Sequence, residues 1–119
     1  MIEHLTKETF EQKVTNFSNS KDWKFEGERP IIIDFYAPWC GPCKLVTPIL
    51  EDLKNEYGDK IEIYKVDTDQ EMELPMIFNV RGVPTIAFFP VGENYFTKVG
   101  AMPKAAFEKI LKEQLKIEK

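Results

Sequence analysis

Two cysteines, Cys40 and Cys43, stand in the pattern Trp-Cys-Gly-Pro-Cys-Lys and are the two cysteines of the sequence. A continuous apolar run precedes the pair and a helical apolar spacing follows it, so the pair falls where a strand gives way to a helix. Residues three apart on a helix have Cβ atoms about 5–6 Å apart, near the separation that a disulfide requires. This spacing predicts a pair that closes into a disulfide and opens again.

The start of a helix favours negative charge, because its first backbone N–H groups lack intrahelical partners and its dipole points its positive end there. We expect Cys40, beside the bulky Trp39, to be the exposed nucleophile with a lowered pKa. Cys43, one turn further in, is expected to be the buried resolving thiol. Pro42 is compatible with the first helical turn, where its missing N–H costs nothing.

Two other interpretations of the cysteine pair exist. Half of a zinc site is one, but structural zinc takes four ligands and the other soft or imidazole ligand in the sequence is His4. Two unreactive surface thiols are the other, and the position between strand and helix argues against them. The redox interpretation therefore comes first, with no metal expected.

Asp34 interrupts the apolar run Ile-Ile-Ile-Asp-Phe-Tyr, so burial is expected to raise its pKa. A buried carboxylate is costly unless it is used or paired. The functional interpretation is a proton acceptor for Cys43; the alternative is a structural carboxylate satisfied by local hydrogen bonds. Lys65, on the inward side of the next strand, either pairs with Asp34 and tunes it or is an ordinary lysine that reaches toward solvent.

Val83-Pro84-Thr85 follows Gly82 and opens a later strand. A cis X-Pro bond there would make a tight turn, whereas a trans proline at a strand start is equally ordinary, and the sequence does not distinguish them.

The apolar spacing predicts a single α/β domain over residues 1–119, in the order β-α-β-α-β-α-β-β-α, with helices on both faces of a mixed sheet. The expected strands are an edge strand at 4–5, a buried strand at 31–36, a strand at 61–66 and a hairpin of strands 85–89 and 95–99. The expected helices are a first helix capped by Thr6, a helix at 43–57, a short helix within 69–79 and a final helix. The first helix has Phe10, Val14 and Phe17 on one face, and the final helix has Phe107, Ile110, Leu111 and Leu115 facing inward. Trp23 and Phe25 are expected to pin the polar connection 18–30 to the body.

Composition narrows the class of function. The chain of 119 residues has 43% hydrophobic residues and a net charge of −4, which is ordinary for a globular protein and offers no basic face for nucleic acid. No run reaches the roughly 18 apolar residues of a membrane span, and the first residues do not read as an export signal. We expect a cytoplasmic protein, or a periplasmic or cell-envelope one if a leader was removed.

The chain resembles the thioredoxin family over nearly its whole length: IIIDFYAPWCGPCKLVTPIL, the YKVD strand end, RGVPT and VGAMPK stand where that family has them. The resemblance implies a thioredoxin fold, with a central mixed five-stranded sheet flanked by four helices. It implies that Cys40 attacks, Cys43 resolves, and Asp34 lies buried beside Lys65. It further implies that Pro84 is cis and packs against the cysteines, that Val83 offers backbone groups to an extended substrate, and that a flat apolar docking surface forms from Trp39, Gly41, Pro42, Gly82, Val83, Pro84, Gly100 and Ala101.

This chain departs from the family's sequence pattern at two places. The connection 18–30 is longer than in the shortest members, and Tyr36 stands where tryptophan is also common. Neither change touches the predicted catalytic set.

The implied function is a protein-disulfide reductase acting by dithiol–disulfide exchange, with no bound cofactor. Its expected partners are disulfide-containing proteins and, as electron donor, thioredoxin reductase or a membrane thiol relay if exported; we expect a monomer. One alternative is a disulfide oxidase or isomerase on the same fold, although Gly41-Pro42 resembles the reductants. Another is a non-catalytic binding subunit of this fold, which would keep its activity without the thiols.

Overall fold

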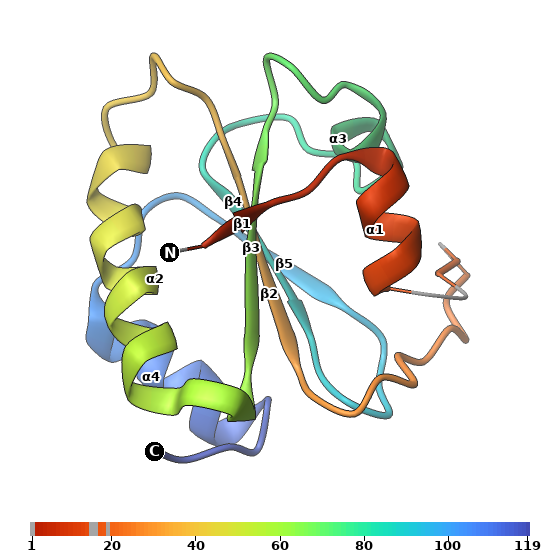
Figure 1. Cartoon of the computed structure of the whole chain (residues 1–119), viewed down its shortest axis with the longest axis vertical. Coiled ribbons are helices and arrows are strands. Elements are labelled where there is room, and N and C mark those ends of the chain that lie inside the picture. The colour runs from red at the N-terminus through yellow and green to blue at the C-terminus, as the bar shows by residue number, and fades with distance from the viewer. Residues whose placement is uncertain (1, 15–16, 19) are drawn as a thin grey trace.

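The computed structural model describes residues 2–14, 17–18 and 20–119 of the chain (Figure 1). Its element order is the predicted one, with a 3₁₀ turn added. The elements are β1 (Glu3–His4), α1 (Lys7–Lys13), β2 (Ile31–Tyr36), α2 (Cys43–Tyr57), η1 (Gly58–Lys60), β3 (Glu62–Asp67), α3 (Glu73–Ile77), β4 (Thr85–Phe89), β5 (Phe96–Val99) and α4 (Lys104–Glu113).

The five strands form one mixed sheet in the order β1-β3-β2-β4-β5. β3 runs parallel to both β1 and β2, whereas β4 is antiparallel to β2 and to β5. β2 is therefore interior, and its buried apolar side chains on both faces account for its continuous apolar run. The expected hairpin of the last two strands is confirmed.

The helices cover both faces of the sheet, as predicted. α2 and α4 lie on one side of it and α1 and α3 on the other (Figure 1). Alternate residues of β2 serve the two cores: Ile32 packs with residues of α2 and α4, whereas Ile33 packs with residues of α1 and α3. This places Asp34, which has the parity of Ile32, on the face that α2 covers.

Local sequence sets the helix ends. Thr6 caps α1, accepting a hydrogen bond from the N–H of Thr9 while its own N–H donates to the Thr9 hydroxyl. Sequence spacing extends this helix to Phe17, but α1 ends at Lys13 with Val14 as its C-cap. That boundary is a correction; residues 15 and 16 lie outside the described residues.

Phe17 is nevertheless half-buried and packs against the core. The centroid of its ring lies 5.6 Å from that of Phe10, 4.8 Å from that of Phe78 and 6.3 Å from that of Phe89. Trp23 and Phe25 also contact Phe89, so the expected anchoring of the polar connection, of which residue 19 is not described, is confirmed. The apolar spacing therefore predicted correctly that Phe17 faces the core, although it misplaced the end of the helix.

Other boundaries shift by a residue or a few. The edge strand is Glu3–His4, β3 begins at Glu62, and β5 begins at Phe96. The short helix α3 spans only Glu73–Ile77 of the predicted stretch. Leu115 is buried, as expected, although α4 ends at Glu113.

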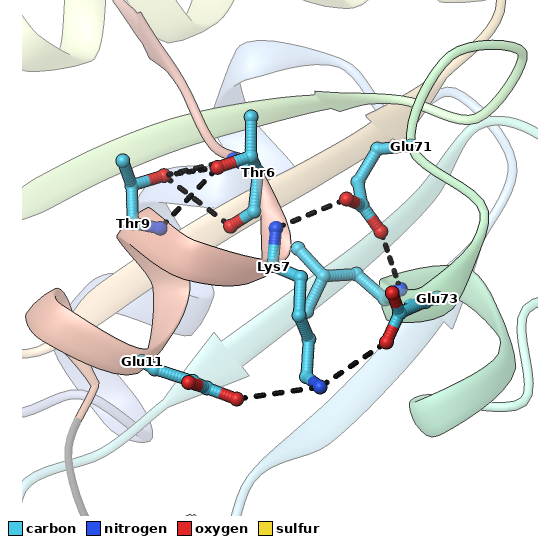
Figure 2. Close-up of polar contacts among 7 residues, drawn as sticks. Thr6, Lys7, Thr9, Glu11, Glu71 and Glu73 are labelled. Carbon is cyan, nitrogen blue, oxygen red and sulfur yellow. Dashed lines mark hydrogen bonds and ion pairs between the residues drawn. The ribbon is translucent and has the colours of Figure 1, made fainter.

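Figure 2 shows how α1 and α3 are joined. The carboxylate of Glu71 accepts the N–H of Lys7 with one oxygen (3.0 Å) and the N–H of Leu74 with the other (2.9 Å). The Lys7 ammonium forms ion pairs with Glu11 (3.3 Å) and Glu73 (3.2 Å). One carboxylate thus serves the unpaired N–H groups at the starts of two helices.

Within the described residues, none of the helices combines the length and the hydropathy that crossing a bilayer requires.

Candidate active site

The cysteine pair lies between β2 and α2, where the strand ends and the helix begins. Cys40 and Cys43 form a disulfide with their Cα atoms 5.4 Å apart, and Cys43 is the first residue of α2. Pro42 has helical backbone angles at the N-cap, φ −58° and ψ −30°, which fits a ring that fixes φ near this value. The sequence-predicted redox pair is therefore assembled by the helix start.

A backbone donor points at the first sulfur. The N–H of Cys43 donates to Sγ of Cys40 across 3.2 Å. This N–H belongs to the first turn of α2, where the helix dipole is positive, so negative charge on the Cys40 sulfur is stabilised there.

The expected exposure of Cys40 is wrong for the disulfide form. Cys40 is 4% exposed and Cys43 is 2% exposed, so both are buried. They pack with Ala37, and the half-buried Tyr36 and Val83 cover this cluster. The disulfide ties the Cys40 sulfur to the first residue of α2, while its neighbours Trp39, Gly41 and Pro42 are exposed.

Asp34 is completely buried, and neither carboxylate oxygen has a hydrogen-bond partner among the residues that the structure describes. Burial raises the pKa of Asp34 to about 7, and the nearby charge of Lys65 partly opposes the rise. The raised pKa agrees with the sequence expectation. A carboxyl group with this pKa exchanges a proton readily near neutral pH.

Lys65 is the direct neighbour of Asp34 on β3, but the two side chains are not hydrogen-bonded. The pair lies in register across the parallel strands. The Lys65 ammonium instead donates to the hydroxyl of Thr47 (2.8 Å) and lies over the Tyr36 ring, 4.3 Å from its centroid. Thr47 was missed by the sequence analysis, because its only signal is that it lies four residues after Cys43 on the same helix face.

The loop before β4 lies at the same edge of the sheet. The Val83–Pro84 peptide bond is cis, as the resemblance implies. The Thr85 hydroxyl donates to the carbonyl of Gly82 (2.5 Å), and the N–H of Gly100 donates to the carbonyl of Pro84 (2.8 Å). Val83 contacts the cysteine cluster.

Trp39 stands out from the surface at 72% exposure, and its indole N–H donates to a carboxylate oxygen of Asp69 (3.3 Å). A surface hollow of about 220 Å³ adjoins it. Trp39, Gly82 and Val83 of the predicted docking set line this hollow, together with Thr68, Pro75, Val80 and Arg81, which the sequence analysis missed. Pro42 and Ala101 are exposed but do not line it.

His4, the possible third zinc ligand, lies beside Tyr36, with ring centroids 5.7 Å apart. In the part of the chain that the structure describes, His, Cys, Asp and Glu side chains nowhere form a group of three or more that could hold a metal ion.

Comparison with known proteins identifies the family. The sequence model of the thioredoxin family, described as "Thioredoxin", matches residues 1–113. A thioredoxin of Borreliella burgdorferi is 48% identical over 109 residues, covering 92% of this chain and 93% of that one. This chain belongs to the thioredoxin family.

Other relatives agree. Thioredoxin 1 of Synechococcus elongatus is 33% identical, with 93% of this chain and 94% of that one covered. A chloroplastic M-type thioredoxin of Spinacia oleracea is 43% identical over 76% of this chain and 50% of its own. The crystal structure of chloroplastic thioredoxin z superposes with a TM-score of 0.78 at 26% identity, covering 92% of this chain and 90% of that chain.

The fold is accordingly a thioredoxin fold, and the chain is a thiol–disulfide oxidoreductase with a redox-active cysteine pair. As a thioredoxin-family protein it reduces disulfides by dithiol exchange, and membership implies disulfide substrates and a reductase-type electron donor.

Proposed function

We propose that Cys40 is the attacking thiolate of this reductase and Cys43 its resolving thiol. The observation that supports this assignment is the N–H of Cys43, which donates to the Cys40 sulfur at the start of α2. A donor fixed by the helix backbone stabilises a thiolate at Cys40, whereas Cys43 is itself the first residue of the helix and is only 2% exposed.

The exchange has two steps. The Cys40 thiolate attacks one sulfur of a substrate disulfide, forms a mixed disulfide, and expels the other substrate sulfur as a thiolate. Cys43 then loses its proton, attacks Sγ of Cys40, and closes the Cys40–Cys43 disulfide while the second substrate sulfur leaves. The two substrate thiolates take up protons, and two electrons have passed to the substrate.

Asp34 is the proposed acceptor of the Cys43 proton, and Lys65 tunes it. Support comes from the buried, unpartnered carboxylate on the face that α2 covers, and from its pKa of about 7, raised by burial against the opposing charge of Lys65. A base whose pKa lies close to the working pH is deprotonated in a useful fraction of molecules and still has a high affinity for a proton.

The proposed docking surface for an extended substrate segment surrounds the cysteine pair. It comprises Trp39, Gly41, Pro42, Gly82, Val83, Pro84, Gly100 and Ala101. The hollow beside Trp39, lined by Gly82 and Val83, supports a seat for one substrate side chain.

The proposed direction is reduction in the cytoplasm, with thioredoxin reductase as electron donor. Gly41-Pro42 supports this direction, since it introduces no charged side chain that would favour the reduced form of the pair. One chain holds both cysteines, so we propose that the monomer is the working unit.

Trapping of the mixed disulfide tests the two thiol roles. With Cys43→Ser, a disulfide-containing protein such as insulin is expected to stay linked to Cys40, giving a complex that a thiol reductant dissolves on a denaturing gel. With Cys40→Ser, the matched variant, the complex is expected to be weak or absent. Equal trapping by both variants, or trapping by Cys40→Ser alone, would refute the assignment.

A further inference from the structure

Thr47 makes a contact that the exchange reaction does not itself require. It lies on α2, one turn after Cys43, and its hydroxyl accepts a hydrogen bond of 2.8 Å from the Lys65 ammonium. Lys65 is 9% exposed, and its ammonium also lies 4.3 Å from the centroid of the Tyr36 ring. Hydroxyl and ring together hold the cation on the α2 side of the sheet.

The alternative partner for this cation is adjacent. Asp34 is the strand neighbour of Lys65, and both of its carboxylate oxygens are buried without a hydrogen-bond partner in the described part of the chain. The neighbour of Asp34 on β3 is the charged Lys65, and its neighbour on β4 is the apolar Ile86. Tyr36, on β2 itself, is a titratable group that interacts electrostatically with Asp34. The Lys65 ammonium, which has three donors, is thus a neighbour of the Asp34 carboxylate, but the two groups form no hydrogen bond with each other.

We propose that Thr47 is a positioning residue that holds the Lys65 ammonium off the Asp34 carboxylate and so leaves Asp34 free to accept the proton of Cys43. This inference rests on the proposed role of Asp34 as proton acceptor. Its physical basis is competition, because a lysine has three donors and binds the nearest good acceptor.

Loss of the hydroxyl has a definite consequence. Without Thr47 as acceptor, the ammonium turns to the carboxylate of Asp34, its strand neighbour, whose buried oxygens have no hydrogen-bond partner among the described residues. A direct ion pair favours the charged carboxylate and occupies the oxygen that would take the proton. Asp34 then becomes a weaker base for Cys43.

The test follows Asp34 directly in the whole chain. Thr47→Val removes the hydroxyl at nearly constant shape, Thr47→Ala removes it without the β-branch, and Thr47→Ser restores it. Carbon-13 NMR of the aspartate carboxyl groups in the disulfide form gives the midpoint of Asp34 titration. We expect a midpoint about one pH unit lower in the Val and Ala variants and a parental midpoint in the Ser variant.

Thr97→Val, the same chemical change on the edge strand β5, is the control and is expected to leave the midpoint in place. An unchanged midpoint in both Val and Ala variants would overturn the inference. A raised midpoint would overturn it too, because it would mean that Thr47 holds the cation toward Asp34.

A kinetic measurement separates this inference from the proposed function. When 5,5′-dithiobis(2-nitrobenzoate) oxidises the reduced protein, attack by Cys40 releases one thionitrobenzoate and attack by Cys43 releases the second. The second release is expected to be about threefold slower at pH 8 in Thr47→Val. A lowered Asp34 midpoint with an unchanged second release would sustain the positioning by Thr47 and refute Asp34 as the acceptor. An unmoved midpoint refutes the positioning whatever the rates.

Discussion

At the residue scale, Asp34 connects folding stability to the redox reaction. The pKa of this carboxyl is about 7 in the folded chain, against an ordinary value near 4, because burial penalises its charged form. Between these two pH values the folded state binds more protons than the unfolded state. The contribution of Asp34 to the free energy of unfolding therefore falls as pH rises from about 4 to about 7 and is level above that window.

Asp34→Asn is expected to remove this pH dependence. The amide has the same shape and no charge, so its fixed packing cost cancels when two pH values are compared. We expect the variant's stability relative to the parent to rise by on the order of 4 kcal/mol between pH 4 and pH 8, the energy of a shift of about three pKa units. Denaturant unfolding of the disulfide form at both pH values measures it.

Asp59→Asn supplies the control, since Asp59 is exposed on η1. Its relative stability is expected to change by less than about 0.5 kcal/mol across the same range. If Asp34→Asn behaved as Asp59→Asn does, burial would not be raising the pKa of Asp34.

At the element scale, Glu71 links the starts of α1 and α3, and α3 leads into the loop that carries Val83 and Pro84. Its carboxylate accepts one N–H from each helix. Glu71→Ala would leave both partly buried donors without this acceptor, so we expect a loss of about 1–3 kcal/mol in the free energy of unfolding. Denaturant unfolding at neutral pH measures the loss.

Glu73→Ala is the matched comparison. Glu73 is mostly exposed and forms a surface ion pair with the Lys7 ammonium, so its removal is expected to cost less than about 1 kcal/mol. Equal costs at the two positions would mean that the double capping by Glu71 contributes nothing beyond a surface ion pair.

The elements also show what the sequence could and could not predict. Apolar spacing identified the strand 31–36 and the helix 43–57 because both have long buried faces. It misplaced the end of α1, because Phe17 packs against the core through ring contacts without being helical, and periodicity reports only which side chains face the core.

At the site, the sequence predicted some residues and not others. The cysteine pair followed from local spacing, and the burial of Asp34 followed from its apolar neighbours. Thr47 and Asp69, which bind Lys65 and Trp39, could not be found, because each contact depends on how distant elements meet. The burial of Cys40 was missed for the same reason: Val83, which covers it, comes from another loop.

At the scale of the whole molecule, sheet order brings these loops together. β4 is antiparallel to β2, so Phe35 at the end of β2 pairs with Thr85 at the start of β4. Thr85 in turn pairs with Val99, which places Gly100 beside Pro84. The segments after β2, before β4 and after β5 therefore meet at one edge of the sheet, around the cysteine pair.

The reduction potential of the Cys40–Cys43 pair measures the outcome of this whole arrangement. Thioredoxin has a reduction potential of about −270 mV and protein disulfide isomerase one of about −180 mV. We expect this chain to lie close to the first value when equilibrated against a dithiothreitol or glutathione series. A value near the second would reverse the direction and favour the oxidase or isomerase alternative.

Pro42→His tests how charge near Cys40 changes the reduction potential. A protonated imidazole beside the start of α2 adds to the field that stabilises the Cys40 thiolate, and so stabilises the reduced form. We expect the potential to rise by about 30 mV or more, since 30 mV corresponds to about 1.4 kcal/mol for two electrons. Pro103→His, at the N-cap of α4, places the same change at another helix start and is expected to leave the potential unaltered. If both variants moved the potential equally, charge near the cysteines would not be its cause, and the reducing direction could not be attributed to Gly41-Pro42.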